Sequence, residues 1–92
     1  GWSHLPWFGA FRAYANGWVY QQALGWVYAS GTSEDDVWLW LPDWGWLWTN
    51  SSVYPYLYSH REQSWLYYLT KDASGKPIFY HFGNDAVLAA EP

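Results

Sequence analysis

The chain has no cysteine and no methionine among its 92 residues. Without cysteine, neither a disulfide framework nor a thiolate metal site can hold the fold together, so an apolar core must do so. The sequence opens at Gly1 rather than at methionine. We therefore expect a segment that is released from a longer precursor.

Positive charge is also scarce. Lysine and arginine together number 4, against 8 aspartates and glutamates, which gives a formal net charge of −4. Proteins that bind nucleic acid need a basic surface for the phosphates, so nucleic acid is not an expected partner. The same balance disfavours docking on an anionic membrane, and no apolar run reaches the roughly 18 to 20 residues of a membrane-spanning helix.

The usual motifs of catalysis and metal binding are missing too. His4, His60 and His81 do not have the close spacing of a chelating motif, and no phosphate loop, nucleophile motif or cofactor fingerprint is present. We therefore predict no catalytic residue, no metal site and no cofactor, and we interpret His81 as a hydrogen-bonded sheet histidine. The acidic residues 34–36 are interpreted as a solvated connector. A small hydrolase with carboxylates from distant strands is kept as a third hypothesis.

Aromatic residues are abundant, with 10 tryptophans, 9 tyrosines and 4 phenylalanines. A single domain of this size buries only about 60 to 65% of the surface of its unfolded chain, so large side chains are needed to stabilise it. Each aromatic ring can bury about 150 to 250 Å². Such residues also favour β-strands.

The tryptophans repeat along the chain. Trp18 and Trp38 are twenty residues apart, as are Trp26 and Trp46, and each unit holds its aromatic motif twice, as in "GWVY" followed by "LGWVY". Alternating aromatic and aliphatic residues have the period of a strand, and the connections have hairpin length. The pattern predicts that Gly25 and Gly45, at the ends of two connections, adopt a left-handed conformation or form a bulge.

These repeats predict an all-β fold, an antiparallel meander of three to four tandem β-hairpins stacked or rolled into one small domain that spans residues 1–92. Residues 1–16 do not follow the repeat and are expected to form an N-terminal cap. Residues 83–92 are expected to form a C-terminal cap or tail, because the terminal units of repeat arrays are usually atypical.

The two faces of each predicted hairpin are both apolar. Trp38 and Trp40 share one face, and Leu39 and Leu41 share the other, because successive side chains of a strand point to opposite sides. The aliphatic face can close a core. The aromatic face can be covered by neighbouring hairpins, by another protein molecule or by a flat apolar ligand, and the sequence leaves these three alternatives open.

The stretch "SWLYYLTKDASGK" resembles the choline-binding and glucan-binding aromatic repeats of bacterial surface proteins. Trp65, Tyr67 and Tyr68 take the aromatic positions of that hairpin, and Gly75 takes the turn. The resemblance implies that aromatic rings from adjacent hairpins enclose a quaternary ammonium group or stack on sugar rings.

Nearly the whole chain resembles an uncharacterised aromatic-rich module at the ends of exported bacterial proteins. The motifs that carry this resemblance are, in chain order, "WFGAF", "GWVY" with "LGWVY", "WLW" with "GWLWT", "VYPYLY", "WLYYL" and "IFYHF". The resemblance implies an extracellular or cell-surface location and does not imply a particular ligand.

We expect a non-catalytic cell-surface module that binds polysaccharide or a cell-wall component by aromatic stacking. The first candidate for a ligand-binding ring is Trp44, because it lies in the turn "LPDWG" and loops place side chains at the surface. A ring folded back over its own hairpin is the alternative for Trp44. The further candidates are Trp38, Trp40, Trp46, Trp48, Trp65 and Tyr67. The alternative function is a structural domain whose aromatic face docks a partner protein or assembles into a homo-oligomer or filament.

Overall fold

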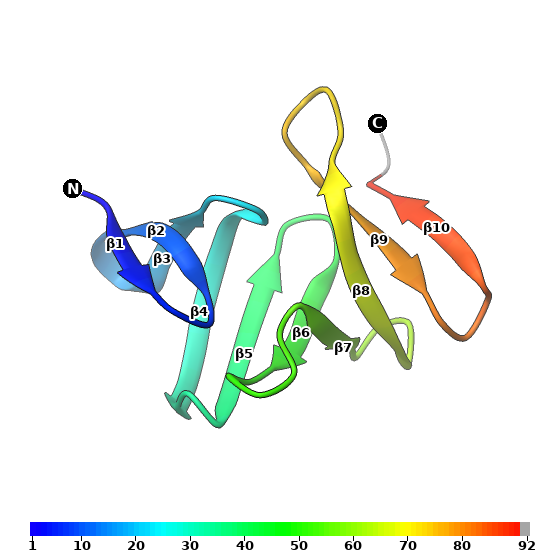
Figure 1. Ribbon diagram of the computed structural model, residues 1–92, viewed down its shortest axis with the longest axis horizontal. Helices are drawn as coiled ribbons and strands as arrows, with labels where there is room; N and C mark the ends of the chain where they lie inside the picture. The colour runs from blue at the N-terminus through cyan, green and yellow to red at the C-terminus, as the bar shows by residue number, and fades with distance from the viewer. Residues whose placement is uncertain (91–92) are drawn as a thin grey trace.

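The computed structural model describes residues 1–90, apart from the side chain of Thr32. These residues form one continuous antiparallel sheet, in which each of ten strands pairs with the next along the chain (Figure 1). This arrangement confirms the predicted all-β meander. The strands are β1 Ser3–Leu5, β2 Gly9–Ala13, β3 Trp18–Gln21, β4 Gly25–Ser33, β5 Asp36–Leu41, β6 Gly45–Thr49, β7 Tyr56–Ser59, β8 Ser64–Lys71, β9 Pro77–His81 and β10 Ala86–Ala89, with a 3₁₀ turn η1 at Ala15–Gly17.

The meander continues through both regions in which caps were expected. Strand β2 pairs with β3 through Phe11 and Gln21, so the N-terminal residues add a further hairpin to the predicted number. At the other end, β10 pairs with β9 through Val87 and Tyr80. The last two residues of the expected C-terminal cap or tail, 91–92, lie outside the described residues.

The aliphatic face of the sheet forms the core, as the alternation predicts. Val27, Leu39, Leu47, Leu57 and Leu66 are all at most 1% exposed. Leu39 pairs with Leu47, and Leu57 pairs with Leu66, so these side chains stack across neighbouring strands. Full burial of each such side chain contributes about 1.5 to 3 kcal/mol, and this core is the main stabilising element of a chain without disulfides.

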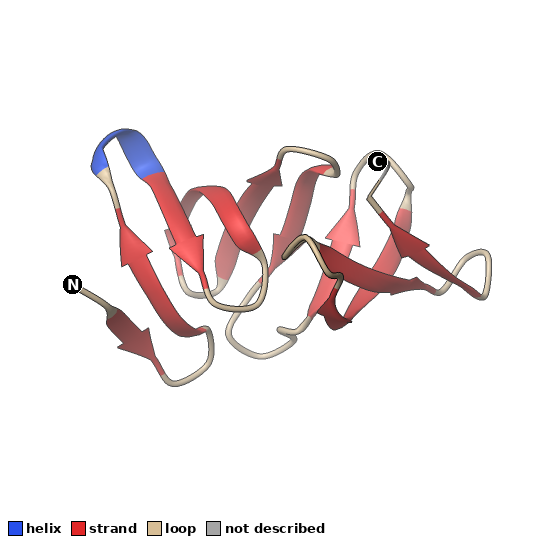
Figure 2. Ribbon diagram, turned by 90° about the horizontal axis from the view of Figure 1, so that it is seen from above, coloured by secondary structure: helices blue, strands red, loops and turns tan. Residues whose placement is uncertain are grey.

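The sheet is rolled rather than flat, and Figure 2 shows that the strands change direction progressively along the chain. The turn between β8 and β9 reaches back to the first half of the molecule, where Lys76 Nζ lies 3.2 Å from Asp43 Oδ2. Gln21 Nε2 donates to the hydroxyl of Tyr54 at 2.8 Å, which joins β3 to the connection between β6 and β7. Phe8 from the first turn and Phe79 from β9 belong to the same buried cluster, so both halves of the chain share one core.

The turns at residues 5–9, 21–25, 41–45, 59–63 and 81–85 have one conformation in common. The fifth residue of each has a positive φ, which confirms the left-handed geometry predicted for two of the glycines. The fifth residues and their φ angles are Gly9 at 87°, Gly25 at 78°, Gly45 at 74°, Gln63 at 51° and Asp85 at 51°.

The first residue of each of these turns binds the backbone N–H of the fourth. Where the first residue is leucine, its carbonyl accepts, as in the 3.0 Å bond from Trp44 N to Leu41 O. Where it is polar, its side chain accepts instead. The side-chain acceptors are Gln21 Oε1 for Leu24 N at 2.6 Å, Ser59 Oγ for Glu62 N at 3.0 Å and His81 Nδ1 for Asn84 N at 3.0 Å. This turn directs an apolar fourth side chain under the hairpin, where Phe8, Leu24 and Trp44 are 8%, 2% and 3% exposed.

Candidate functional site

Trp44 lies in the core and not at the surface, so the expectation of an exposed ligand-binding ring is wrong. Its side chain is 3% exposed, and its ring meets that of Phe79 edge to face with centroids 4.9 Å apart. The physical reason is its place as the fourth residue of the turn that Gly45 closes. The alternative, a ring folded back beneath its own hairpin, describes the observed position.

The other predicted rings lie on the outer face of the sheet, opposite the aliphatic core. None of them is buried, and Trp46 and Trp65 are each 38% exposed. The structure adds Trp26, Tyr56 and Phe82 to the exposed outer rings, at 46%, 44% and 47%. The alternation of the strands places Trp26 and Tyr56 there, whereas Phe82 follows β9 and belongs to a turn.

Pairing between strands aligns the outer rings into rows that run across the sheet. Trp38 pairs with Trp48, Trp48 with Tyr58, and Tyr58 with Trp65. The N–H of Phe82 donates to Trp65 O at 3.1 Å, which extends this row to the turn after β9. Because neighbouring strands lie about 4.8 Å apart, the row presents one ring per strand. A second row runs through Trp18, Tyr28, Trp40 and Trp46.

The aromatic rings of the described residues fall into two groups, and every ring pair joins two members of the same group. The inner group packs in or against the aliphatic core, and its members pair only among themselves. The outer group forms edge-to-face and stacked pairs along the surface. The inner group comprises Trp7, Phe8, Phe11, Trp44, Tyr54, Tyr68 and Phe79. Outer rings thus gain support from one another without leaving the surface.

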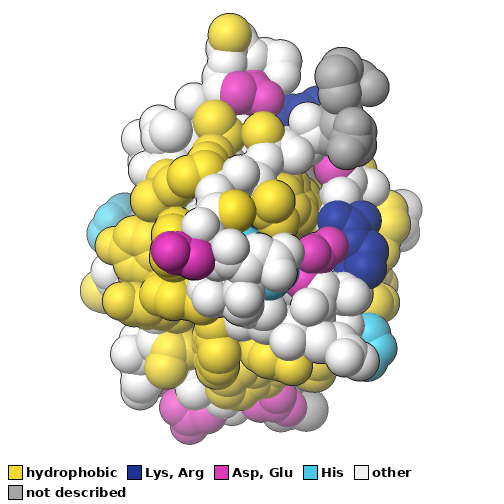
Figure 3. Space-filling model, turned by 90° about the vertical axis from the view of Figure 1, so that its right-hand side faces the viewer, with side chains coloured by type: hydrophobic (Ala, Val, Ile, Leu, Met, Phe, Trp, Pro, Cys, Tyr) yellow, Lys and Arg dark blue, Asp and Glu magenta, His cyan; other side chains and the backbone are white. Residues whose placement is uncertain are grey.

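An open cleft of about 710 Å³ interrupts the outer face, and we call it the aromatic cleft. Its lining is mostly apolar, and hydrophobic side chains cover a broad area of the molecule at the β10 end (Figure 3). No charged side chain lines it among the described residues. The lining residues are Ser52, Val53, Tyr54, Tyr56, Trp65 and Phe82.

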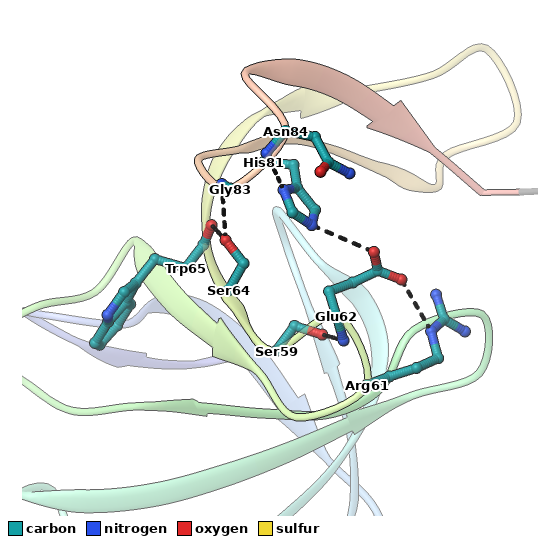
Figure 4. Close-up of polar contacts among 8 residues, drawn as sticks. All are labelled: Ser59, Arg61, Glu62, Ser64, Trp65, His81, Gly83 and Asn84. Atoms are coloured by element: carbon teal, nitrogen blue, oxygen red, sulfur yellow. Dashed lines mark hydrogen bonds and ion pairs between the residues drawn. The ribbon is translucent and has the colours of Figure 1, made fainter.

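His81 lies close to the aromatic cleft but is buried, at 3% exposure. Its Nδ1 accepts the N–H of Asn84 at 3.0 Å, and its Nε2 lies 3.3 Å from Glu62 Oε1 without forming a hydrogen bond (Figure 4). Because Nδ1 accepts a backbone N–H, the ring proton of the neutral histidine is on Nε2. The prediction of a hydrogen-bonded sheet histidine is confirmed.

Ser64 stands beside His81 without forming a nucleophilic pair with it. The Ser64 hydroxyl donates to Trp65 O at 3.2 Å and accepts the N–H of Gly83 at 2.9 Å (Figure 4). A nucleophilic serine needs a base that accepts its proton, and the one accepting nitrogen of His81 is occupied by Asn84. The cluster therefore holds the turn after β9 in place, and that turn carries Phe82.

Two tyrosines show how the inner and outer groups differ in their surroundings. Burial raises the pKa of Tyr54 from its ordinary value of 10.0, and the hydrogen bond with Gln21 opposes this rise. The pKa of Tyr80 on the outer face is raised by its hydrogen bond to Asp85, which also fixes the ring. The surroundings of Tyr54 are thus set by the core, and those of Tyr80 by a carboxylate at the surface.

The acidic residues 34–36 are exposed, and Glu34 and Asp35 form the expected connector between β4 and β5. Asp36 is instead the first residue of β5, where its Oδ1 accepts the indole N–H of Trp48 at 2.8 Å. Over residues 1–90, no three histidine, aspartate or glutamate side chains come close enough to hold a metal ion. In the same range, no helix is long and apolar enough to cross a membrane.

No family model, curated protein or solved structure matches the chain. The resemblance to aromatic surface modules therefore stays a prediction. The case for function depends on the geometry of the outer face.

Proposed function

We propose that the chain is a non-catalytic attachment module at the cell surface that binds polysaccharide or cell-wall material through its outer aromatic face. The observation that carries the proposal is the pair of ring rows on that face, in which Trp46 and Trp65 stay 38% exposed. The buried leucines on the opposite face already close the core. The outer rings are therefore not needed to close this core, and their exposed parts are available to a ligand.

The chemistry of these rings suits a sugar surface. An aromatic ring offers a flat apolar side to the C–H groups of a sugar and, in tryptophan, an N–H at its edge. The indole N–H groups of Trp46 and Trp65 form no hydrogen bond with the described residues, whereas that of Trp48 donates to Asp36 at 2.8 Å. Several rings in one row can engage consecutive sugars, which strengthens binding to a polymer over binding to one sugar.

Pull-down on insoluble polysaccharides and cell-wall preparations tests this function. The double variant Trp46→Ala and Trp65→Ala should lose most of its retention. The matched control is Val87→Ala, which removes an aliphatic side chain that is 63% exposed on the outer face. Equal retention of all three proteins, or no retention of the wild type on any preparation, contradicts the proposal.

A second candidate function, self-assembly or docking to a protein, is favoured by a different observation. Within residues 1–90, β1 and β10 each pair with one strand only, so both edges of the sheet are open to another strand. The broad apolar outer face adds to this tendency. Light scattering over a dilution series separates the candidates, because a monomer at all concentrations contradicts self-assembly.

A further inference from the structure

We propose that the aromatic cleft is the principal subsite of the outer face and that it takes an uncharged sugar ring. This inference rests on the proposed polysaccharide function and adds to it a place and a ligand class. The aromatic walls of the cleft are formed by Tyr56, Trp65 and Phe82, which come from β7, β8 and the turn after β9.

The rings of the cleft are held in position before a ligand arrives. Tyr56 and Phe82 lie nearly parallel, with an interplanar angle of 24° and centroids 5.9 Å apart. Each is supported from the side, Phe82 by Tyr80 at 4.8 Å and 84°, and Tyr56 by Tyr67 at 4.7 Å and 64°. Binding to rings that are already fixed loses less side-chain entropy than binding to mobile ones.

The turn that carries Phe82 is fixed from beneath. His81 Nδ1 binds Asn84 N–H at 3.0 Å, and Ser64 Oγ binds Gly83 N–H at 2.9 Å (Figure 4). A Cβ added at Gly83 would lie 3.0 Å from His81 Cε1, so the turn has little room to move inward. Phe82 therefore stays 47% exposed at the edge of the cleft.

The positions of the cationic side chains favour an uncharged ligand in the cleft. All four cationic side chains of the chain are engaged elsewhere, so a carboxylate or phosphate on a ligand would meet no partner in the cleft. Ser52, Tyr56 and Trp65 instead offer neutral hydroxyl and indole groups, which can form hydrogen bonds with the hydroxyl groups of a sugar. The cations are Arg12 over the Tyr14 ring, Lys71 over the Tyr20 ring, Arg61 at Asp43 O and Lys76 at Asp43 Oδ2.

Calorimetry with soluble oligosaccharides tests the inference. The probes are neutral hexasaccharides of glucose, N-acetylglucosamine, mannose and xylose, a uronic-acid hexasaccharide, and phosphatidylcholine vesicles. The wild type should bind at least one neutral probe, and Phe82→Ala and Trp65→Ala should each weaken that binding at least tenfold. Phe82→Tyr should retain it, which separates loss of the ring from loss of the fold.

The matched control is Trp26→Ala, because Trp26 is 46% exposed on the outer face but pairs with Tyr14 and Tyr20, away from the cleft. It should change binding less than threefold. Equal weakening by all three alanine variants contradicts the assignment of the cleft as the principal subsite. It does not contradict binding of polysaccharide by the outer face. If the uronic-acid probe binds as tightly as the neutral probes, or if only the vesicles bind, the ligand is not an uncharged sugar. Failure of the wild type to bind any oligosaccharide or polysaccharide overturns the proposed function as well.

Discussion

The two faces of this sheet are built from the same strands yet differ in the type of their side chains and in their exposure to solvent. Leu47 is fully buried, and its neighbour Trp46 is 38% exposed. An antiparallel sheet with one solvated face normally carries polar residues there, whereas this one carries indole and phenol rings. Leucines make up most of the buried core, and Trp46 and the other outer rings keep part of their surface exposed to solvent.

Trp44 and Trp46 give the sharpest form of this comparison, because they are two residues apart and lie on opposite sides of the sheet. Trp44→Ala should lower the free energy of unfolding by about 3 to 5 kcal/mol, since it removes a buried ring and leaves a cavity. Trp46→Ala should lower it by about 1 kcal/mol or less, because only surface ring pairs are lost. Urea denaturation followed by circular dichroism measures both. Equal losses would show that the outer rings also hold the fold.

Polar residues on the inner side can be compared in the same way. Gln21 is 2% exposed, and its Nε2 donates hydrogen bonds to Phe8 O and to the Tyr54 hydroxyl. Its Oε1 accepts the backbone N–H groups of Ala23 and Leu24. Gln21→Ala should lower the free energy of unfolding by about 1 to 3 kcal/mol, because buried partners are left unsatisfied.

The control for Gln21 is Gln22→Ala, since Gln22 is the next residue and is exposed. Its effect should stay within about 0.5 kcal/mol. A Gln21 variant as stable as this control would show that the turn at residues 21–25 does not depend on its side-chain acceptor.

The five similar turns differ in how well their fifth residue suits a positive φ. Gly45→Ala should destabilise the fold by about 1 to 2 kcal/mol, because a residue with a Cβ is strained at φ 74°. Gln63→Gly should stabilise it by about 0.5 to 1 kcal/mol, because the strain at φ 51° exceeds the added chain entropy. Thermal denaturation measures both changes. A lowered melting temperature for Gln63→Gly would contradict the shared turn geometry.

The smallest expected effect concerns alkaline pH. Burial raises the pKa of Tyr54, so the folded state favours its protonated form. The stability from this group is fully present below the unfolded pKa of about 10 and is lost as pH rises through the higher folded pKa. Above pH 10, the free energy of unfolding of Tyr54→Phe should therefore decrease less with rising pH than that of the wild type. Denaturation experiments at several pH values measure this difference. An identical pH profile for both proteins would contradict the burial of this hydroxyl.

The period of two in the sequence predicts both faces of the sheet, because strand geometry fixes which residues share a side. It does not predict the position of Trp44, which depends on the turn and not on a strand. The shared spacing of Phe8, Leu24 and Trp44, each one residue before a glycine, is the signal that indicates an inward fourth residue.

The aromatic cleft could not be predicted from periodicity. It joins Tyr56 of β7 to Phe82 of the turn after β9, and their approach depends on the register of three strands and on the roll of the sheet. Register follows from turn geometry and pairing along the whole meander, which local alternation does not encode. The candidate Trp65 was predicted, but its neighbours in the cleft were not.

Hydrogen exchange of the indole N–H groups, followed by nuclear magnetic resonance on protein with ¹⁵N-labelled tryptophan, tests the division of the rings most directly. The account predicts that Trp7 and Trp44, whose Nε1 atoms are buried, exchange slowly. The exposed indoles of Trp26, Trp46 and Trp65 should exchange within the dead time. Slow exchange at Trp46 and Trp65, or fast exchange at Trp44, would contradict an aliphatic core beneath a free aromatic face.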